Sequence, residues 1–350
     1  MDLPLVSIII PCRNEEKFIR KCLDSIIAQD YPKERLEVLV VDGASKDRTK
    51  EFVKDYMGGH SFLALFDNPK KFTAFGLNIG IRNAKGAVIV RMDAHAGYEK
   101  EYISKCVKYL NEYRVDNVGG VMITVSRSNT LLGKAIVAVL SHRFGVGNAI
   151  FRIGAKEPVL VDTVFGGCYR KEVFEKIGYF NEDLQRGQDM DFNLRLRKSG
   201  GKILLVPEIK SFYYARSDFK SFLGHSFTDG VELISPLRFG VAIFCWRHVV
   251  PLVFVSSLIT LGLLAFFSLK FLWLLLVFLG LYSLLGIYFS VIISFVEKDI
   301  RYLLLAPVVF AVLHIGYGLG SVVGLSKVFW SAQFWGNLKT ALIQRLKANK

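Results

Sequence analysis

The sequence predicts an α/β module with a mostly parallel, doubly wound sheet, followed by a helical membrane module. Two observations lead to this prediction. Apolar runs typical of buried strands alternate with amphipathic helical patterns along the first half of the chain. Hydrophobic residues make up 52% of the 350 residues, and this excess is concentrated after residue 248. We therefore expect a water-exposed module at residues 1–215 and transmembrane helices within residues 249–326.

The first two expected strands each end in a polar loop. Residues 5–10 form an apolar run, and Asn14 can cap the helix that follows. In that helix, apolar residues recur every three or four positions over residues 18–27, which predicts packing on a sheet. A second apolar run, residues 36–41, ends in Asp42. Two such strands with a helix between them begin a parallel sheet.

A later strand end carries an aspartate and a histidine. Residues 87–90 are apolar and lead to Asp93 and His95. Ligands of open α/β sheets bind beyond the carboxyl ends of the strands, so these side chains and Asp42 should face one crevice. A carboxylate and an imidazole can share a divalent cation if the backbone turns between them. The alternative is an aspartate that caps the next helix and a histidine that faces solvent.

Amide and basic groups near this crevice suit a diphosphate. Asn78 and Arg82 lie in a segment rich in small residues, 73–86. Both groups can bind phosphate oxygens, although a surface helix with solvated charges is an equally good interpretation. The dinucleotide motif G-x-G-x-x-G does not follow the first strand, which argues against an NAD-dependent enzyme.

The second half of this module offers another carboxylate. Residues 162–167 resemble an apolar strand ending in glycines, with a helix from about residue 170. Asp189 precedes a further helix that ends at Gly200. Its carboxylate can cap that helix, or it can act as a general base toward an acceptor hydroxyl, and both interpretations stay open. The other expected elements are strands at residues 62–66 and 118–125 and a helix at residues 99–113.

Three C-terminal stretches are long enough to cross a membrane. At about 1.5 Å per residue, some 20 residues cross a hydrocarbon core of roughly 30 Å. The expected spans are residues 249–269, 271–295 and 302–325. Residues 216–248 mix apolar and basic side chains, as in an amphipathic segment lying in the headgroup plane. Residues 327–350 form a basic amphipathic tail.

Composition bears on location and partners. The first strand follows the N-terminus without a secretory apolar region, so we expect the α/β module to be cytoplasmic. Five cysteines without a C-x-x-C pair argue against a disulfide framework and a structural zinc site. The net charge of +14 is not accompanied by a nucleic-acid motif, and basic residues flank the apolar stretches, where anionic lipids attract them. We therefore expect an integral membrane protein that does not bind nucleic acid. The side of the C-terminus stays open, because three spans would place the basic tail outside.

The order of these pieces resembles glycosyltransferase family 2, whose members have the GT-A fold. The chain is most similar to the membrane-bound subgroup that includes succinoglycan-biosynthesis glycosyltransferases, which also has D-A-H-A in place of the usual D-x-D. The resemblance covers nearly the whole chain. The matching motifs are S-I-I-I-P-C-R-N-E-E, V-V-D-G-A-S-K-D, A-F-G-L-N-I-G-I-R-N-A-K-G, R-M-D-A-H-A, V-F-G-G-C-Y-R-K-E-V-F-E-K-I-G and Q-D-M-D-F-N-L-R-L-R-K-S-G-G.

The resemblance implies roles for individual residues. Asp93 and His95 would hold a divalent metal, Mn²⁺ or Mg²⁺, and Asp189 would be the general base. The residues along a UDP- or GDP-type sugar donor would be Pro11, Arg13, Asn14, Glu15, Asp42, Asn78 and Arg82. The residues on the acceptor side would be Phe165, Gly166, Gly167 and Gln188. An imidazole ligand favours manganese, because magnesium prefers oxygen ligands.

The expected activity is that of an inverting, metal-dependent hexosyltransferase. A single base on the far side of the sugar gives in-line attack and inversion, by analogy with inverting hydrolysis. The acceptor is expected to be lipid-linked, such as a polyprenyl phosphate or a polyprenyl-diphosphate-linked sugar, because the catalytic module is tied to a membrane. The alternative is that the membrane module is only a tether and the acceptor is soluble. Two departures from the family pattern matter: Gln188 replaces the usual glutamate, and the absence of Q-x-x-R-W argues against long-chain polymerisation. The alternative is a non-catalytic membrane scaffold that retains the nucleotide-binding fold.

Overall fold

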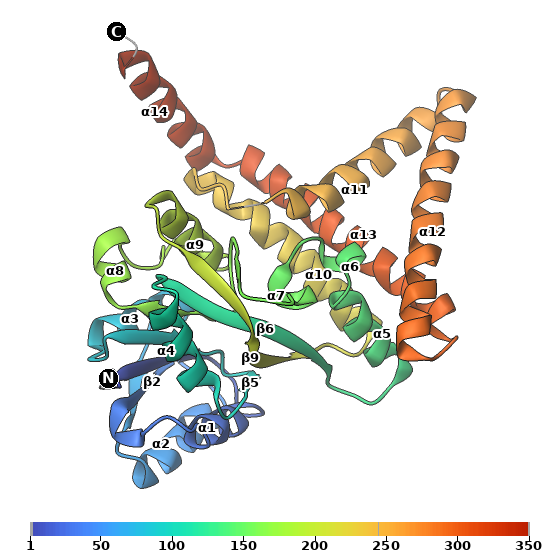
Figure 1. Ribbon diagram of the computed structural model, residues 1–350. Coiled ribbons are helices and arrows are strands. Elements are labelled where there is room, and N and C mark those ends of the chain that lie inside the picture. The colour runs from blue at the N-terminus through green and yellow to red at the C-terminus, as the bar shows by residue number, and fades with distance from the viewer. Residues whose placement is uncertain (1–2, 244, 349–350) are drawn as a thin grey trace. The chain divides into compact units, whose positions relative to one another are not determined.

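The computed structural model describes residues 3–243 and 245–348, with the backbone alone described over residues 341–348. Contacts divide the chain into two compact units, which Figure 1 shows as ribbons. The first, here called the sheet unit, comprises Met1–Ile123 and Ile150–Tyr214. The second, the helical unit, comprises Thr124–Ala149 and Ala215–Lys350. The last two residues of the expected basic tail lie outside the described residues.

Half of the sheet is parallel and alternates with helices. Its strands run in the order β3-β2-β1-β4, and each neighbouring pair is parallel. This half matches the expected doubly wound arrangement. The strands are β1 (Val6–Cys12), β2 (Leu36–Asp42), β3 (Leu63–Asp67) and β4 (Val88–Arg91), and the helices between them are α1 (Ile19–Ile27), α2 (Thr49–Gly59) and α3 (Thr73–Asn83).

The other half of the sheet is antiparallel, so the sheet as a whole is mixed. The order continues β4-β8-β6-β9-β5, with β7 beside β9. The pairs β4–β8, β6–β8, β5–β9 and β7–β9 are antiparallel. The expectation of a mostly parallel sheet thus describes only the N-terminal half. The strands here are β5 (Ala96–Tyr98), β6 (Asn117–Ser126), β7 (Val159–Leu160), β8 (Cys168–Arg170) and β9 (Ile203–Ala215), and the helices of this part are α4 (Tyr102–Glu112), α7 (Ile150–Ile153), α8 (Glu172–Ile177) and α9 (Gln188–Lys198).

Residues 162–167 do not form the expected strand. Gly166 and Gly167 have φ angles of +70° and +100°, which lie outside the extended region of strands. The chain therefore turns there, and strand β8 begins only at Cys168. Apolar composition alone predicted a strand, but the two glycines make a loop at the same place.

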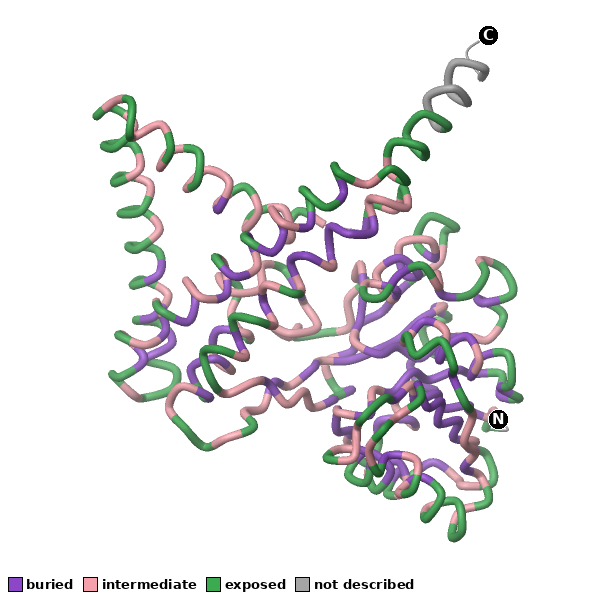
Figure 2. Tube along the Cα trace, turned by 180° about the vertical axis from the view of Figure 1, so that it is seen from behind, coloured by how far each residue is buried: buried purple, intermediate pink, exposed green. Residues whose placement is uncertain are grey.

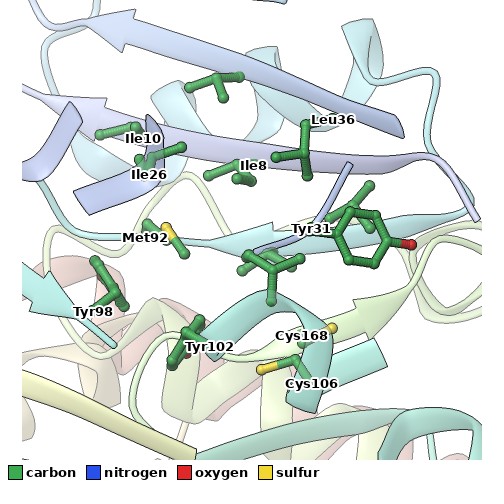
Figure 3. Packing of buried hydrophobic residues seen from close by; sticks show 14 of the residues in the cluster. Ile8, Ile10, Ile26, Tyr31, Leu36, Met92, Tyr98, Tyr102, Cys106 and Cys168 are labelled. Atoms are coloured by element: carbon green, nitrogen blue, oxygen red, sulfur yellow. The ribbon is translucent and has the colours of Figure 1, made fainter. Parts of the chain in front are cut away.

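Apolar side chains cover both faces of the parallel half. Because successive strand residues point to opposite faces, Ile8 and Ile10 of β1 join one buried cluster while Ile9 joins the other. Figure 3 shows the first cluster, in which Tyr102 and Cys106 of α4 face the strands. Burying one such side chain stabilises the fold by about 1.5–3 kcal/mol. A strand buried on both faces has a continuous apolar sequence, which is the pattern that predicted it.

Three helices of the helical unit are long and apolar enough to cross a membrane: α11 (Trp246–Ala265), α12 (Leu269–Glu297) and α13 (Tyr302–Phe329). They correspond to the three expected spans. Exposed positions run along much of α11 and α12 in Figure 2, and Phe266 and Leu304 are 87% and 80% exposed. Such side chains are suited to contact with lipid hydrocarbon. The remaining elements are α5 (Leu131–Leu140), α6 (Arg143–Val146), α10 (Phe219–Ile234), η2 (Ser235–Phe239) and α14 (Ala332–Ala348).

Within the helical unit, α10 packs closely along α13. A Cβ added at Gly320 would lie 2.0 Å from the carbonyl oxygen of Phe227, so glycine is needed for this approach. His314 of α13 lies 3.0 Å from the Tyr282 hydroxyl and 2.9 Å from the Phe144 carbonyl, as expected of a histidine that bonds a neighbouring helix. The amphipathic segment expected at residues 216–248 thus contains a helix with one face packed on an apolar helix.

Candidate active site

Two loops that follow strands β1 and β2 are joined by hydrogen bonds. The backbone N–H of Asn14 donates to Ser45 Oγ at 2.8 Å, and that of Glu15 donates to Thr49 Oγ1 at 2.8 Å. In return, Asn14 Oδ1 accepts from the Lys46 N–H at 2.8 Å. The two loops therefore form one body at the carboxyl edge of the sheet, the place expected for a ligand.

Asn14 does not cap a helix, contrary to expectation. Its φ is +55°, a left-handed conformation, and helix α1 begins only at Ile19 after Phe18. Asparagine tolerates this conformation better than most residues. Its side chain serves the neighbouring loop instead. Arg13 beside it is exposed and Pro11 lies within β1.

Asp42, at the end of β2, has a fully buried carboxylate. The Ser45 N–H donates to its Oδ2 at 3.0 Å, and the Lys50 ammonium lies 3.9 Å from the same oxygen. The other oxygen, Oδ1, has no hydrogen-bond partner among the described residues. A buried acceptor without a donor is costly, so an N–H group of a ligand would be a favourable partner. A Cβ added at the neighbouring Gly43 would lie 3.0 Å from the Lys71 carbonyl oxygen, so glycine allows the two segments to lie close together.

Asn78 and Arg82 face a different part of the sheet unit. The Asn78 amide donates to the Phe180 carbonyl at 2.9 Å and to Glu182 Oε1 at 2.8 Å, and its oxygen accepts from the Phe180 N–H at 3.0 Å. The Arg82 guanidinium lies 3.8 Å from Glu182 and stacks over the ring of Tyr179. Asn78 thus orders the loop after α8, and its hydrogen-bonding groups are engaged within the protein.

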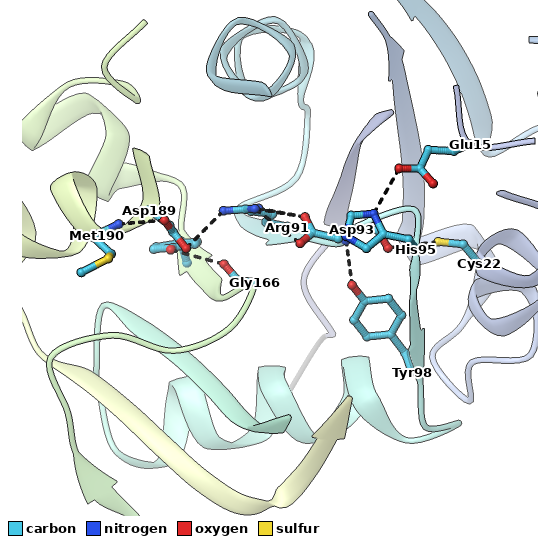
Figure 4. Close-up of polar contacts among 10 residues, drawn as sticks. Glu15, Cys22, Arg91, Asp93, His95, Tyr98, Gly166, Asp189 and Met190 are labelled. Carbon is cyan, nitrogen blue, oxygen red and sulfur yellow. Dashed lines mark hydrogen bonds and ion pairs between the residues drawn. The ribbon is translucent and has the colours of Figure 1, made fainter. Parts of the chain in front are cut away.

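The Asp93 carboxylate, just beyond β4, is held by a buried arginine. Arg91 Nε and Nη2 donate to Asp93 Oδ1 at 3.2 and 3.1 Å, and Figure 4 shows this contact. The Asp93 N–H donates to the Tyr98 hydroxyl at 2.7 Å. Burial acts to raise the pKa of the Asp93 carboxyl, but the charges of Arg91 and His95 outweigh it and lower that pKa. Asp93 is therefore an anion at neutral pH.

His95 points to the loop that follows β1. Its Nδ1 lies 3.1 Å from Glu15 Oε1, and its side chain is 41% exposed. The contact joins the Asp93 turn to the body formed by the first two loops. Glu15, expected along the nucleotide, thus also fixes the orientation of the imidazole.

Asp189 lies in the first turn of α9, and the N-cap position belongs to Gly187. Asp189 Oδ1 accepts from the Met190 N–H at 3.0 Å, and Oδ2 lies 3.7 Å from Arg91 Nη1. Its side chain is 31% exposed. A carboxylate in the first turn is favoured as the anion by the helix dipole. Asp189 is therefore not the cap of this helix, whereas a role as general base is compatible with its position beside Arg91.

The glycine loop lies directly on the end of β4. The Arg91 N–H donates to the Gly167 carbonyl at 3.0 Å. A Cβ at Gly166 would lie 2.9 Å from the Arg91 carbonyl oxygen. Gln188, at the start of α9, is 6% exposed, and its Oε1 has no hydrogen-bond partner among the described residues. The structure thus brings Gly166, Gly167 and Asp189 next to Arg91. Phe165, which precedes Gly166 in the chain, is half-buried.

The Asp93–His95 pair fits a divalent cation that a substrate would help to hold. Within the described ranges, no group of three or more histidine, cysteine, aspartate or glutamate side chains is placed to bind a metal. Mg²⁺ in phosphate-transfer sites is commonly held by one or two carboxylates, with substrate phosphates and water completing the shell. A histidine ligand usually donates its second N–H to a carboxylate, and Glu15 is placed to accept it. The donor set thus suits a cation completed by a diphosphate.

Sequence reasoning missed two residues of this site. Arg91 is 8% exposed and contacts both candidate carboxylates, and Tyr98 orients the Asp93 backbone. A basic residue directly after an apolar strand was a weak signal for Arg91, because the same pattern is common where a strand emerges into solvent. Its contact with Asp189 joins residues 98 positions apart, which no local pattern reveals.

The chain matches known proteins over most of its length. A family model described as "Glycosyl transferase family 2" matches residues 7–178. The chain is 33% identical over 270 residues to a dolichyl N-acetyl-alpha-D-glucosaminyl phosphate 3-beta-D-2,3-diacetamido-2,3-dideoxy-beta-D-glucuronosyltransferase of Methanococcus voltae, which covers 75% of this chain and 83% of that protein. It is 26% identical to the succinoglycan biosynthesis protein ExoA of Rhizobium meliloti, over 70% of this chain and 80% of that protein.

A solved structure shares the fold. The mannosyltransferase PcManGT from Pyrobaculum calidifontis, solved in complex with GDP-Man and Mn²⁺, has a TM-score of 0.63 and 20% identity. The match covers 92% of this chain and 87% of that one. The mixed sheet with its helices, followed by long apolar helices, is therefore an arrangement that a known protein also adopts.

Proposed function

Since the chain belongs to glycosyltransferase family 2 and has the GT-A fold, we propose that it catalyses inverting, metal-dependent transfer of a sugar from a nucleotide-diphosphate sugar to a lipid-linked acceptor. It is a glycosyltransferase of glycan or polysaccharide biosynthesis. One observation carries the finer proposal: the carboxylates of Asp93 and Asp189 lie on either side of the buried Arg91 guanidinium. Asp93 would hold a cation that neutralises the leaving diphosphate. Asp189 would accept the proton of the incoming hydroxyl.

The donor side would be formed by Asp93 and His95 with the nucleotide loops. A bound Mn²⁺ or Mg²⁺ would neutralise charge that develops on the leaving diphosphate. Asp93 is anionic and His95 is oriented by Glu15, so both are prepared to hold such a cation. PcManGT, a structural neighbour, carries Mn²⁺ together with GDP-Man, and an imidazole ligand also favours manganese.

The nucleotide would lie across the loops after β1 and β2. The proposed contacts are Pro11, Arg13, Asn14 and Glu15. Asp42 would accept from a base N–H through its unsatisfied Oδ1. Both UDP and GDP present such N–H groups, so the donor class stays UDP- or GDP-type. Asn78 and Arg82 are left out of the proposed contacts, because the Asn78 amide is engaged by the loop after α8 and the Arg82 guanidinium lies against Glu182 and Tyr179.

Asp189 would be the general base. Its carboxylate is partly exposed at the start of α9 and can accept a proton from an acceptor hydroxyl. Attack from the side opposite the diphosphate would invert the anomeric centre. The glycine loop, with Phe165, Gly166 and Gly167, and the buried Gln188 would border the acceptor. The acceptor hydroxyl, the sugar carbon and the diphosphate would then lie in line between Asp189 and Asp93.

The acceptor is proposed to carry a lipid. Three apolar helices long enough to span a membrane follow the sheet unit in the chain. The name of the Methanococcus voltae relative states a dolichyl phosphate-linked sugar as its acceptor. A phosphate-linked polyprenyl chain is thus the acceptor class that we propose here, with the catalytic domain on the cytoplasmic side.

Substitution of the proposed base tests this function. Asp189→Asn should lower sugar transfer at least about 100-fold and leave donor binding intact, because general bases contribute 10²–10⁴-fold. Transfer would be measured with a panel of UDP- and GDP-sugars, Mn²⁺ and polyprenyl-phosphate-linked sugars whose hydroxyls can act as acceptors, and donor binding by thermal shift. Asp183→Asn, at an exposed aspartate in the same loop region, is the matched control and should keep wild-type activity.

Two results would contradict the proposal. An Asp189→Asn enzyme with near wild-type turnover would remove the assigned base. A folded wild-type protein that binds donors but transfers no sugar to any acceptor would favour the non-catalytic scaffold instead.

A further inference from the structure

We propose that Arg91 is a positioning residue of the transfer reaction. Its guanidinium holds the Asp93 and Asp189 carboxylates in fixed relative positions, so that the leaving diphosphate and the incoming hydroxyl are aligned. This inference rests on the proposed function and deepens it. Arg91 would touch neither substrate. It would act through the two carboxylates on its flanks.

The contacts of the guanidinium are divided between two edges. Nε and Nη2 form one edge, and both donate to Asp93 Oδ1 at 3.2 and 3.1 Å. Nη1, on the opposite side, lies 3.7 Å from Asp189 Oδ2 and has no hydrogen-bond partner among the described residues. The Asp189 contact is therefore an ion pair that can shorten into a hydrogen bond. Figure 4 shows Arg91 between the two carboxylates.

The backbone that carries this guanidinium is rigid. Arg91 is the last residue of β4 and pairs with Ile9 of β1 in the parallel half of the sheet. Its N–H is bonded to the Gly167 carbonyl, and its carbonyl is packed against Gly166. Catalytic groups are held best by residues on strands and helices that are themselves locked by packing. The two carboxylates come from separate segments, one after β4 and one on α9, so a common partner is needed to relate them.

The charge balance supports the same role. A buried arginine is stable only when its charge is paired, and a single aspartate would leave Nη1 without a counter-charge. Two carboxylates near each other would repel, and the guanidinium between them removes that repulsion. The Arg91 guanidinium therefore balances the charge of two carboxylates, one proposed to hold a cation and the other to take a proton.

The planar fork of arginine is what allows one side chain to serve two carboxylates. A lysine has the same charge, but its compact ammonium can lie against only one of them. Asp93 Oδ2 also accepts a hydrogen bond from Nη2, at 3.5 Å, which is longer than the two contacts of Oδ1. Arg91 thus holds the Asp93 carboxylate mainly through Oδ1, and Oδ2 is the more weakly held oxygen.

The test compares Arg91→Gln and Arg91→Lys with a matched arginine. Arg195, on α9, is bonded to Asp191 Oδ2 at 2.9 Å, so Arg195→Gln removes an arginine–aspartate pair outside the array. Three quantities would be measured on the full-length protein: kcat, KM for the sugar donor, and Mn²⁺ affinity in the presence of UDP or GDP by electron paramagnetic resonance. The last needs no turnover.

Arg91→Gln should weaken Mn²⁺ binding and lower kcat, each about 10- to 100-fold, as is typical when a residue that orients a ligand is lost. KM for the donor should change far less. Arg91→Lys should recover either part of the Mn²⁺ affinity or part of kcat, but not both, relative to Arg91→Gln. Arg195→Gln should lower thermal stability and leave the Mn²⁺ affinity unchanged.

Several outcomes would overturn the inference. The positioning role of Arg91 would be contradicted if folded Arg91→Gln protein had a Mn²⁺ affinity and a kcat within about twofold of wild type. It would also be contradicted if only the Mn²⁺ affinity or only kcat changed. If Arg91→Gln does not fold, Arg91→Lys decides in the same way. Wild-type protein that binds Mn²⁺ and nucleotide but transfers no sugar would instead overturn the proposed function, and this inference with it.

Discussion

Replacing Gly166 by alanine should impair transfer because it pushes on the backbone of Arg91. Gly166 has a φ of +70°, a conformation that costs an alanine about 1–2 kcal/mol. Its new Cβ would also lie 2.9 Å from the Arg91 carbonyl oxygen, closer than ordinary contact. Relieving such overpacking costs typically about 1–3 kcal/mol. The folded state should therefore lose about 2–5 kcal/mol in total.

Gly240 provides a matched control for the strain alone. Its φ is +77° and its ψ is +12°, a left-handed conformation, and a Cβ there would meet no atom within 4 Å. Gly240→Ala should therefore cost only the backbone term of about 1–2 kcal/mol, or roughly 2–8 °C in Tm. Gly166→Ala should lower Tm further. Since about 1.4 kcal/mol of transition-state stabilisation is tenfold in rate, a displaced Arg91 should lower kcat by about tenfold or more in Gly166→Ala only.

The assay is Tm by scanning fluorimetry in detergent, together with kcat for sugar transfer at saturating donor. Gly166→Ala with the Tm and kcat of Gly240→Ala would show that the contact with Arg91 does not matter. Loss of kcat in both variants would also refute the reasoning, because Gly240 follows η2 and is assigned no contact with the site.

Three further predictions concern other parts of the chain. Glu15→Gln should raise the Mn²⁺ concentration needed for activity about 10- to 100-fold, because the His95 ring loses its anionic partner; a metal titration checks this. Burial acts to raise the pKa of Asp47, but hydrogen bonds from a threonine hydroxyl and from backbone N–H groups lower it, so its stabilisation is present above the unfolded pKa of about 3.9 and lost as pH falls through the folded pKa. Asp47→Asn should thus lower Tm at neutral pH and flatten its decline in acid. Gly320→Ala should lower Tm in detergent, since its Cβ would lie 2.0 Å from a carbonyl oxygen of α10. Gly280→Ala, in open space within α12, should leave Tm unchanged or raise it slightly, because alanine is the better helix former; equal Tm values for the two variants would refute the close helix packing.

Local sequence patterns predicted the parallel half of the sheet well. Strands β1, β2 and β4 are buried on both faces, so their sequences are continuous apolar runs, and their flanking helices have regular apolar spacing. The long apolar helices α11 to α13 were likewise evident from composition. In these elements the surroundings are apolar along the whole segment, so the apolar residue types by themselves indicate the structure.

Strand β9 and the glycine loop could not be recognised in the same way. β9 contains Pro207, Glu208 and Lys210, residues that usually argue against a central strand. It is a strand because β5 and β7 supply its hydrogen-bonding partners. Residues 162–167 show the reverse case, since an apolar segment is held as a loop by the left-handed φ angles of Gly166 and Gly167.

The sequence by itself determined that this protein has two acids, Asp42 and Asp93, at or just beyond the ends of parallel strands, and apolar helices after the sheet. The sequence also determined which motifs resemble those of glycosyltransferase family 2. Only the tertiary structure decided the partners: Arg91 between Asp93 and Asp189, and Glu15 on His95. Residue type indicates whether a position is buried or lies in a turn, because these are local properties. The Glu15–His95 and Arg91–Asp189 contacts, across 80 and 98 positions, depend instead on how separate segments pack.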